Sequence, residues 1–230
     1  MRTLILFLLL TAPLHAKTIR GKVTDPAGAP IPGAMISAFD DERRQSISVF
    51  SQSDGSFVLD NLHQADFRLR ARLLGKRDLW LDKVHPKKPI TLTMESVTGR
   101  ELQEQRPASS AFGMLPFDSV RDKLNFKMMC AYCHQIGTQG FRTPEEPVDW
   151  ETMITRMDGF GGLYPHSKST IVQRIIDTYK DDAIDKWPEY IPPPAPTGMA
   201  ANARITAWEV GEPYEGSYHD LEPGPDGLMY

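Results

Sequence analysis

The stretch Phe67-Arg68-Leu69-Arg70-Ala71-Arg72-Leu73 decides how the first part of this chain folds. Apolar and charged side chains alternate along it, which is typical of a β-strand with one buried face and one wet face. The stretch from Ile90 to Met94 alternates in the same way. Turn-forming sequences separate such stretches: Asp25-Pro-Ala-Gly28, Pro32-Gly33 and Ser53-Asp-Gly55. We therefore predict an antiparallel β-sandwich of about seven strands over residues 17–98.

Three segments give this sandwich a resemblance to a known family. Ile19–Asp25, Gly28–Ala34 and Ser53–Phe57 resemble the carboxypeptidase regulatory-like domains, which are small immunoglobulin- or transthyretin-like sandwiches. The resemblance implies a fold and a binding or spacer role. It implies no peptidase activity, because the chain has no zinc-binding catalytic domain. The row Arg68, Arg70 and Arg72 is either a docking face for an acidic partner or an ordinary solvated face of the sheet.

The N-terminus has the features of a secretory signal peptide. Arg2 precedes the apolar run Leu4–Leu10, and Ala16 is a small residue suited to cleavage before Lys17. The run is shorter than the roughly 20 residues that span a bilayer, although a buried strand or an uncleaved anchor remains an alternative. No later stretch is apolar enough to cross a membrane. We expect residues 1–16 to be removed and the protein to be periplasmic or secreted, with no membrane span.

Composition narrows the possible functions. The chain has 230 residues, which is more than one average domain and fewer than three, and 40% of them are hydrophobic, which is enough apolar material for a core. Its 26 basic and 30 acidic residues give a net charge of −4, which argues against a general nucleic-acid binder. The two cysteines are too few for a disulfide framework.

The second half of the chain changes period. Residues 99–117 are predicted to be a polar linker and residues 188–200 a stiff Pro-rich linker. Between them, residues 118–187 are predicted to form three short helices. The expected core-facing positions are Val120, Leu124 and Met128, then Trp150, Met153 and Met157, then Ile171, Val172, Ile175, Ile176 and Tyr179.

Both cysteines lie in Cys130-Ala-Tyr-Cys133-His134, and C-x-x-C-H is the attachment signature of c-type haem. Two intervening residues set the thiols about one helical turn apart, which suits the two vinyl groups of the ring. His134 is then placed to offer a nitrogen to the iron. We predict one covalent haem c.

Other uses of the two cysteines fit less well. A redox disulfide opens a helix in a βαβ unit, but here a helical pattern precedes the motif. A zinc site needs four ligands, and no second cysteine pair exists. A structural disulfide across two intervening residues is strained.

The segments that follow the motif carry a second resemblance. Arg142–Glu146, Trp150–Met157 and Ile171–Tyr179 are similar to the class I-like mono-haem domains of multidomain periplasmic cytochromes and quinohaem dehydrogenases. The resemblance implies that an Arg-Met pair on the middle helix supplies the distal sulfur, which falls on Met157. Met153 and His166 are alternative ligands, and an open site is a further possibility. Methionine opposite histidine raises the reduction potential, whereas two histidines lower it.

The last segment, residues 201–230, contains two short strand-like stretches around Gly224-Pro-Asp-Gly227. They resemble the first blade of a streptogramin-lyase-like β-propeller. A propeller needs at least four blades, so this segment is an incomplete propeller-like tail.

The predicted fold class is therefore multidomain: an all-β sandwich, then a small all-α cytochrome c domain, then a short β tail. The predicted function is electron transfer to a redox partner protein through a haem with His134 and Met157 as ligands. One alternative is the N-terminal portion of a propeller-containing haem enzyme, a dehydrogenase or a lyase. Another is a non-redox binding protein. The sequence favours an electron carrier over an enzyme.

Overall fold

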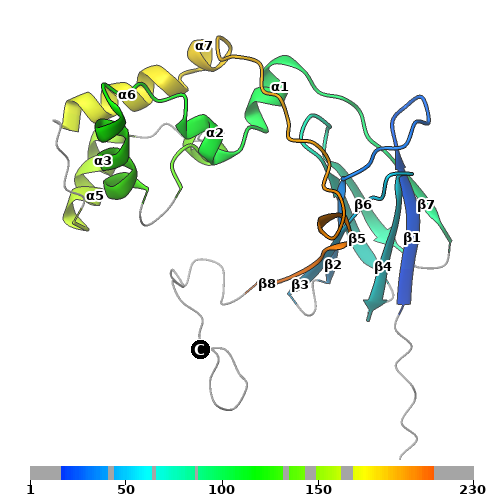
Figure 1. Cartoon of the computed structure of the whole chain (residues 1–230). Helices are drawn as coiled ribbons and strands as arrows, with labels where there is room; N and C mark the ends of the chain where they lie inside the picture. Colours follow the sequence, from blue (N-terminus) through cyan, green and yellow to red (C-terminus); the bar gives the residue numbers. More distant parts are fainter. Residues whose placement is uncertain are drawn as a thin grey trace, which may run out of the picture.

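The structure is a computed structural model that describes residues 17–40, 44–63, 66–85, 88–131, 135–142, 149–161 and 168–209 (Figure 1). The predicted signal peptide, residues 1–16, lies outside them. The first part of the chain contains seven strands, in agreement with the alternation of apolar and polar residues. They are β1 (Lys17–Thr24), β2 (Met35–Asp40), β3 (Gln45–Phe50), β4 (Ser56–Leu62), β5 (Phe67–Arg72), β6 (Leu79–Val84) and β7 (Ile90–Thr93).

The strands make two sheets. One has the order β4-β1-β7, and the other has the order β6-β5-β2-β3-β8, where β8 is Arg204–Trp208 near the end of the described chain. All pairs are antiparallel except β1 and β7, which run parallel with Gly21 opposite Ile90. The chain crosses from β6 in one sheet to β7 in the other, and it arrives beside β1 in the same direction.

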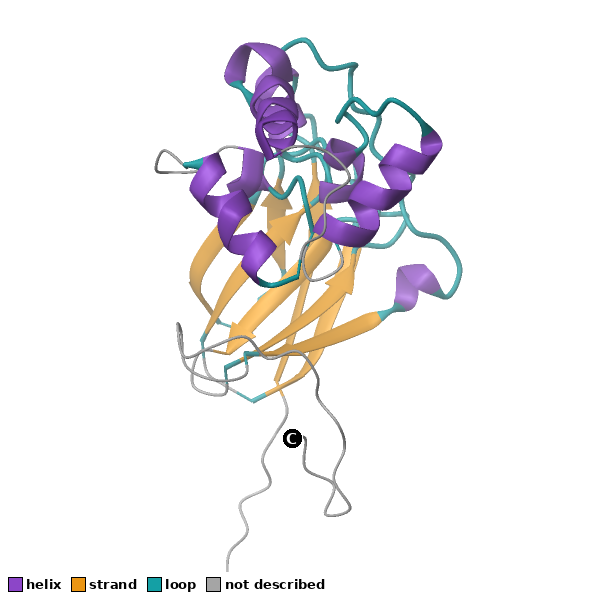
Figure 2. Cartoon of the chain, turned by 90° about the vertical axis from the view of Figure 1, so that its left-hand side faces the viewer, coloured by secondary structure: helices purple, strands orange, loops and turns teal. Residues whose placement is uncertain are grey.

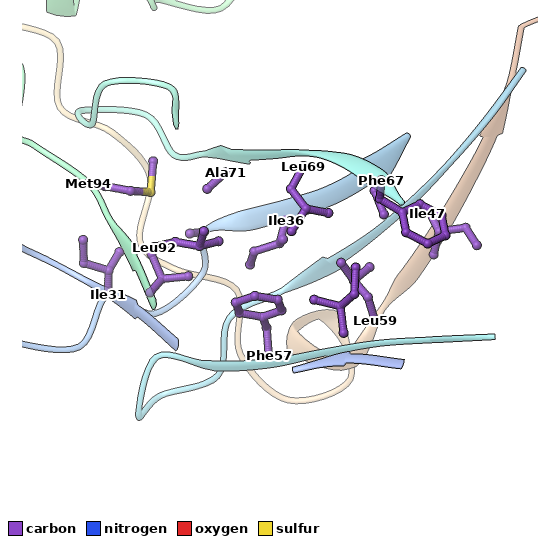
Figure 3. Packing of buried hydrophobic residues seen from close by; sticks show 14 of the residues in the cluster. Ile31, Ile36, Ile47, Phe57, Leu59, Phe67, Leu69, Ala71, Leu92 and Met94 are labelled. Atoms are coloured by element: carbon purple, nitrogen blue, oxygen red, sulfur yellow. The ribbon is translucent and has the colours of Figure 1, made fainter. Parts of the chain in front are cut away.

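The core of the sandwich lies between the two sheets (Figure 3). On β5 the predicted alternation is observed, since Phe67, Leu69 and Ala71 are buried while Arg68 and Arg72 are exposed. Ile36 and Leu59 reach the same core from β2 and β4. Burial of this apolar surface is the main stabilising contribution to the fold.

Turn chemistry connects the strands as predicted. The Asp25 carboxylate accepts a hydrogen bond from the Ala29 backbone N–H at 2.8 Å, and Gly28 takes a φ of 85°, a left-handed conformation that glycine adopts without strain.

The helices all lie between β7 and the end of the described chain. They are α1 (Gly99–Glu104), α2 (Ala108–Phe112), α3 (Val120–Cys130), α4 (Gln139–Arg142), α5 (Trp150–Gly159), α6 (Lys168–Tyr179) and α7 (Asp181–Ile184), followed by the short 3₁₀ helix η1 (Ala200–Asn202). Helices α1 to α7 gather beside the upper end of the strands, as both views show, whereas η1 lies beside the five-stranded sheet (Figures 1 and 2). Residues 99–117, predicted as a linker, contain α1 and α2.

The chain then returns to the sandwich. The Pro-rich run passes along it in an extended form, so closely that a side chain on Gly33 would meet Ala195 at 2.7 Å. It leads into β8, which pairs with β3 with Arg204 opposite Val49 and Trp208 opposite Gln45. Residues 204–208 therefore extend the five-stranded sheet instead of beginning a propeller blade.

The predicted fold class is consequently wrong. The chain is a mixed α/β protein in which the strands of one sandwich come from both sides of the helices, and the helices are not a separate all-α cytochrome c domain that follows an all-β one. The prediction failed because the pairing of β3 with β8 joins residues that are about 160 apart in sequence, and no local pattern reports such a pairing.

The predicted inward face of α3 is also wrong. Val120, Leu124 and Met128 are exposed by 78%, 54% and 66%, whereas Phe126 is buried. Both faces of this helix carry apolar residues, so a period of four identified the helix without identifying its buried side. Phe126 packs in a second cluster with Phe112 of α2, Ile154 of α5, and Ile171 and Ile175 of α6.

This reversal is testable with two substitutions in α3. Phe126→Ala should lower the free energy of unfolding by about 3 kcal/mol or more, because a buried ring leaves a cavity. Leu124→Ala should change it by no more than about 0.5 kcal/mol, since the side chain is half exposed and alanine favours helix. Urea denaturation followed by circular dichroism measures both. Equal losses for the two variants would contradict the observed orientation of α3.

Candidate haem attachment site

Helix α3 brings the first cysteine of the C-x-x-C-H motif to the helical cluster. Ser119 caps the helix, and its hydroxyl accepts a hydrogen bond from the Asp122 N–H at 3.0 Å. The helix ends at Cys130, one turn beyond Phe126. Cys130 is half-buried and packs against the same cluster as Phe126. The thiol therefore stands at the border between the apolar interior and the solvent.

A buried ion pair fixes α3 against α6. Asp122 and Arg174 each have side chains that are only 7% exposed, and Asp122 Oδ2 lies 3.2 Å from Arg174 Nη1. The Arg174 guanidinium also lies over the Phe117 ring, 5.2 Å from its centroid. Because Nη1 makes no aligned hydrogen bond, the attraction is one of charge and stacking. This pair holds the start of α3, two turns before Cys130.

The segment after the motif threads between α2 and α6. Ile136 is buried in the cluster, and Gly137 adopts a φ of 89°. A Cβ on Gly137 would lie 3.0 Å from the Ala108 carbonyl oxygen and from the Phe112 nitrogen, so only glycine fits there without displacing α2. Phe141 of α4 then packs on Trp150 with ring centroids 4.7 Å apart. The chain on both sides of the motif is thus held.

Arg142 ties this segment to α1. It is buried and donates hydrogen bonds to the carbonyl oxygens of Gln103 and Glu104, at 3.3 and 2.8 Å. These carbonyls end α1 and have no partners within the helix. Burial lowers the pKa of Arg142, and the nearby Arg106 and Arg100 lower it further. Alternation and helical periodicity carry no signal for a buried arginine, so the sequence did not reveal this contact.

Helix α5 carries the predicted distal ligand. Asp149 caps it by accepting from the N–H groups of Glu151 and Thr152. The hydrogen bond from the Thr152 hydroxyl, followed by these backbone bonds, holds the pKa of the Asp149 carboxyl below the usual range. Ile154 is buried, and Met157, one turn later, is half-buried on the same side of the helix. Met153 is 38% exposed. Met157 therefore lies on the inward side of α5, and Met153 lies at its edge.

The other predicted site residues fall outside the described residues. These are Cys133, His134 and the alternative ligand His166. In the part of the chain that is described, no group of three or more His, Cys, Asp or Glu side chains could hold a metal ion.

Residues 18–97 match the family model of the carboxypeptidase regulatory-like domain. This part of the chain is a carboxypeptidase regulatory-like domain. The match confirms the resemblance predicted for residues 17–98, and it does not extend into the helices. Such domains are typical of extracellular or surface proteins.

Comparison with solved structures finds pilins. The chain resembles in part a streptococcal ancillary pilin (14% identity, TM-score 0.30), the minor pilin of Streptococcus agalactiae (12%, 0.30) and the major pilin subunit of Bacillus cereus (13%, 0.28). These matches cover 36%, 36% and 35% of this chain and 30%, 45% and 29% of the pilins. Similarity at this level assigns no function. No curated protein matches the chain.

The prediction of a separate cytochrome c domain with a group of metal ligands, followed by a propeller fragment, is therefore wrong for the described residues; the attachment motif itself lies partly outside them, at Cys133 and His134. The family found is that of the sandwich, the described residues hold no cluster of metal ligands, and the strand assigned to a propeller belongs to the sandwich sheet. None of the described helices is both long enough and apolar enough to cross a membrane.

A pH titration tests the packing around the site. Tyr179 is buried beside Phe141 and its hydroxyl donates to the Ala111 carbonyl oxygen at 3.3 Å. Burial raises the pKa of this phenol, so its folded form stays neutral above pH 10. The stability that this group contributes is complete below its ordinary pKa of about 10 and is lost as the pH rises further.

Tyr179→Phe should therefore cost about 1 kcal/mol at pH 7 through the lost hydrogen bond. Between pH 10 and about 11.5 its free energy of unfolding should fall less steeply than that of the unaltered chain. Urea denaturation at several pH values measures both slopes. Parallel slopes would show that Tyr179 ionises in the folded state as it does in water.

Proposed function

We propose that this chain binds one haem covalently through Cys130 and Cys133, with His134 as the proximal ligand, and transfers electrons through it to a redox partner protein. The observation that carries the proposal is the Cys130-Ala-Tyr-Cys133-His134 motif at the end of α3, with Cys130 against an apolar cluster. Each thiol would add its S–H across one vinyl C=C bond of the ring and form a thioether.

The described residues fit such a group. A haem carries its own iron within the ring and needs at most two axial atoms from the protein, so it does not depend on a cluster of three or more ligating side chains. The apolar cluster beside Cys130 offers a low-dielectric wall with Phe126 and Ile136. Phe141 and Trp150 add aromatic surface to the same cluster.

When bound, the haem supplies an iron that alternates between two oxidation states and so carries one electron at a time. The chain's own residues hold and tune it. His134 would hold the iron through a ring nitrogen, and the sulfur of Met157 would be the second protein ligand. The inward position of Met157 on α5 supports it over the more exposed Met153.

The proposal also includes the compartment. The N-terminal signal pattern and the carboxypeptidase regulatory-like domain both suit an exported protein, and we propose that it works in the periplasm or outside the cell. Haem attachment of this kind needs both thiols to be reduced in that compartment when the bonds form. Once the two cysteines are thioethers, they can no longer form a disulfide.

Covalent attachment is tested by coexpression of the full chain with c-type haem maturation proteins. The product should retain a haem stain on a denaturing gel. Cys130→Ala and Cys133→Ala should each weaken that stain, and the double variant should abolish it. Exposed Ser109→Ala is a matched control that should leave the stain unchanged. An unaltered chain that carries no covalent haem would refute the proposal.

The distal ligand is tested in the holoprotein. Met157→Ala should remove the weak absorption band near the red end of the oxidised spectrum that sulfur–iron bonding produces, and it should lower the reduction potential. Met153→Ala should leave both unchanged. If Met157→Ala leaves both unchanged, another group is the ligand, and His166→Ala then becomes the variant to compare.

A further inference from the structure

The outer face of the five-stranded sheet bears a surface of cations and aromatic rings. Alternation on β5 points three arginines away from the core, and two large rings flank them. We name this surface the arginine face, and it consists of Phe39, Arg68, Arg70, Arg72 and Trp80. The rings of Phe39 and Trp80 lie 5.3 Å apart, and Trp80 is 43% exposed.

Arg68 differs from the other two arginines. Arg70 donates to Asp78, and Arg72 lies 3.9 Å from the same carboxylate. Arg68 is exposed, and among the described residues no carboxylate lies within ion-pair distance of it. Its guanidinium instead lies 5.4 Å from the centre of the Phe39 ring and 5.0 Å from that of Trp80.

This stacking prepares Arg68 for an anion. A guanidinium held over aromatic rings has already lost much of its rotational freedom, so binding a carboxylate costs less entropy. Stacking on ring faces uses the plane of the group and leaves its N–H edge for a planar partner such as a carboxylate. The arginine face therefore fits an acidic polypeptide with at least one carboxylate at Arg68.

A groove joins this face to the point where the described chain ends. It has a volume of about 330 Å³ and is lined by Phe39, Asp40, Arg44, Gln45, Ser46, Ala207, Trp208 and Glu209. The register places Arg68 opposite Phe39, Phe39 opposite Ser46, and Ser46 opposite Ala207. Three strand spacings of about 4.8 Å give roughly 14 Å from Ala207 to Arg68.

The sequence beyond Glu209 is acidic, so its charge is opposite to that of the arginine face. Residues 210–230 contain five carboxylates and no lysine or arginine. They are Glu212, Glu215, Asp220, Glu222 and Asp226. At about 3.3 Å per residue, six residues from Glu209 to Glu215 span up to roughly 20 Å, which exceeds the distance to Arg68.

We propose that the acidic segment 210–230 binds along this groove onto the arginine face of its own chain, with one of its carboxylates paired to Arg68. Arg44 lies 4.0 Å from Glu209 at the end of β8, so the last described residue is already in ion-pair contact with the lining of the groove. The bound segment would cover Trp80 and Phe39 and would compete with any acidic partner for the same face. This proposal is independent of the haem.

The experiment measures how fast phenylglyoxal modifies each arginine of the full chain, with peptide mass spectrometry as the readout. In a variant with all five carboxylates changed to amides, Arg68 should react about threefold to fivefold faster than in the unaltered chain, a factor that an exposed ion pair supplies. The exposed Arg20 on β1, in the other sheet, is the matched control and should not change.

Two further measurements decide the origin of the protection. In the unaltered chain, salt at about 0.5 M should raise the reactivity of Arg68 toward that of the amide variant, because screening weakens exposed pairs. Protection should be independent of protein concentration. Equal reactivity of Arg68 in both chains would overturn the proposal. Protection that disappears on dilution would overturn it too, since the segment of a second copy would then be the occupant.

Discussion

The guanidinium of Arg106 joins the two halves of the molecule. It is buried, and it donates to the Gln103 side chain at 3.0 Å and to the Pro188 carbonyl oxygen at 2.5 Å. It also lies between the rings of Trp187 and Tyr190, 5.3 and 5.2 Å from their centres. The chain that leaves the sandwich and the chain that returns to it are therefore bonded to the same side chain. The helices therefore lie between two segments of chain that meet at Arg106.

The residue next to Arg106 joins the helices to the sandwich. Gln105, next to Arg106, bonds the Gly75 N–H and the Lys76 carbonyl oxygen of the sandwich, both at 2.8 Å. Trp187 meets Tyr179 of the helical cluster with ring centres 6.0 Å apart. Burial lowers the pKa of Arg106, and no carboxylate among the described residues pairs with it, so neutral hydrogen-bond acceptors and ring faces balance its charge, including the Ser110 hydroxyl at 3.4 Å. A buried cation with such partners fixes one geometry, because any displacement leaves it unsatisfied.

The sequence predicts those features that depend on residues close together in the chain. In Phe67 to Arg72 the alternation of residue types is enough to predict which side chains are buried. The predicted bounds of the sandwich agree with those of the family match to within a residue or two. The strand that pairs with β3 lies far away in sequence, and for this reason the sequence pattern placed β8 in a propeller-like tail. In α3, Phe126 and Leu124 are equally apolar, and only tertiary contacts decide which is buried. Buried Arg106, Arg142 and Arg174 follow no periodic rule, because their burial depends on partners that folding brings together. For the candidate site, the motif predicts the chemistry of Cys130, whereas the ion pair of Asp122 with Arg174 that holds α3 had no readable signal.

The apolar cluster formed by the helices, which includes Phe112, Phe126 and Ile175, is small, and its size is relevant to the proposed haem. Among the described residues, the helix that ends in Cys130, the segment that follows the motif and α5 contribute one buried apolar side chain each, namely Phe126, Ile136 and Ile154. Small cores gain little stability from burial alone. Contacts of charge and stacking therefore carry a large share of the packing here, as at Arg174 over Phe117 and Phe141 on Trp150. A covalently bound apolar group at Cys130 and Cys133 would contact α3, the segment after the motif and α5, which have few buried apolar side chains of their own. The proposed cofactor would then stabilise the helices that position it, while Arg106 sets their orientation on the sandwich.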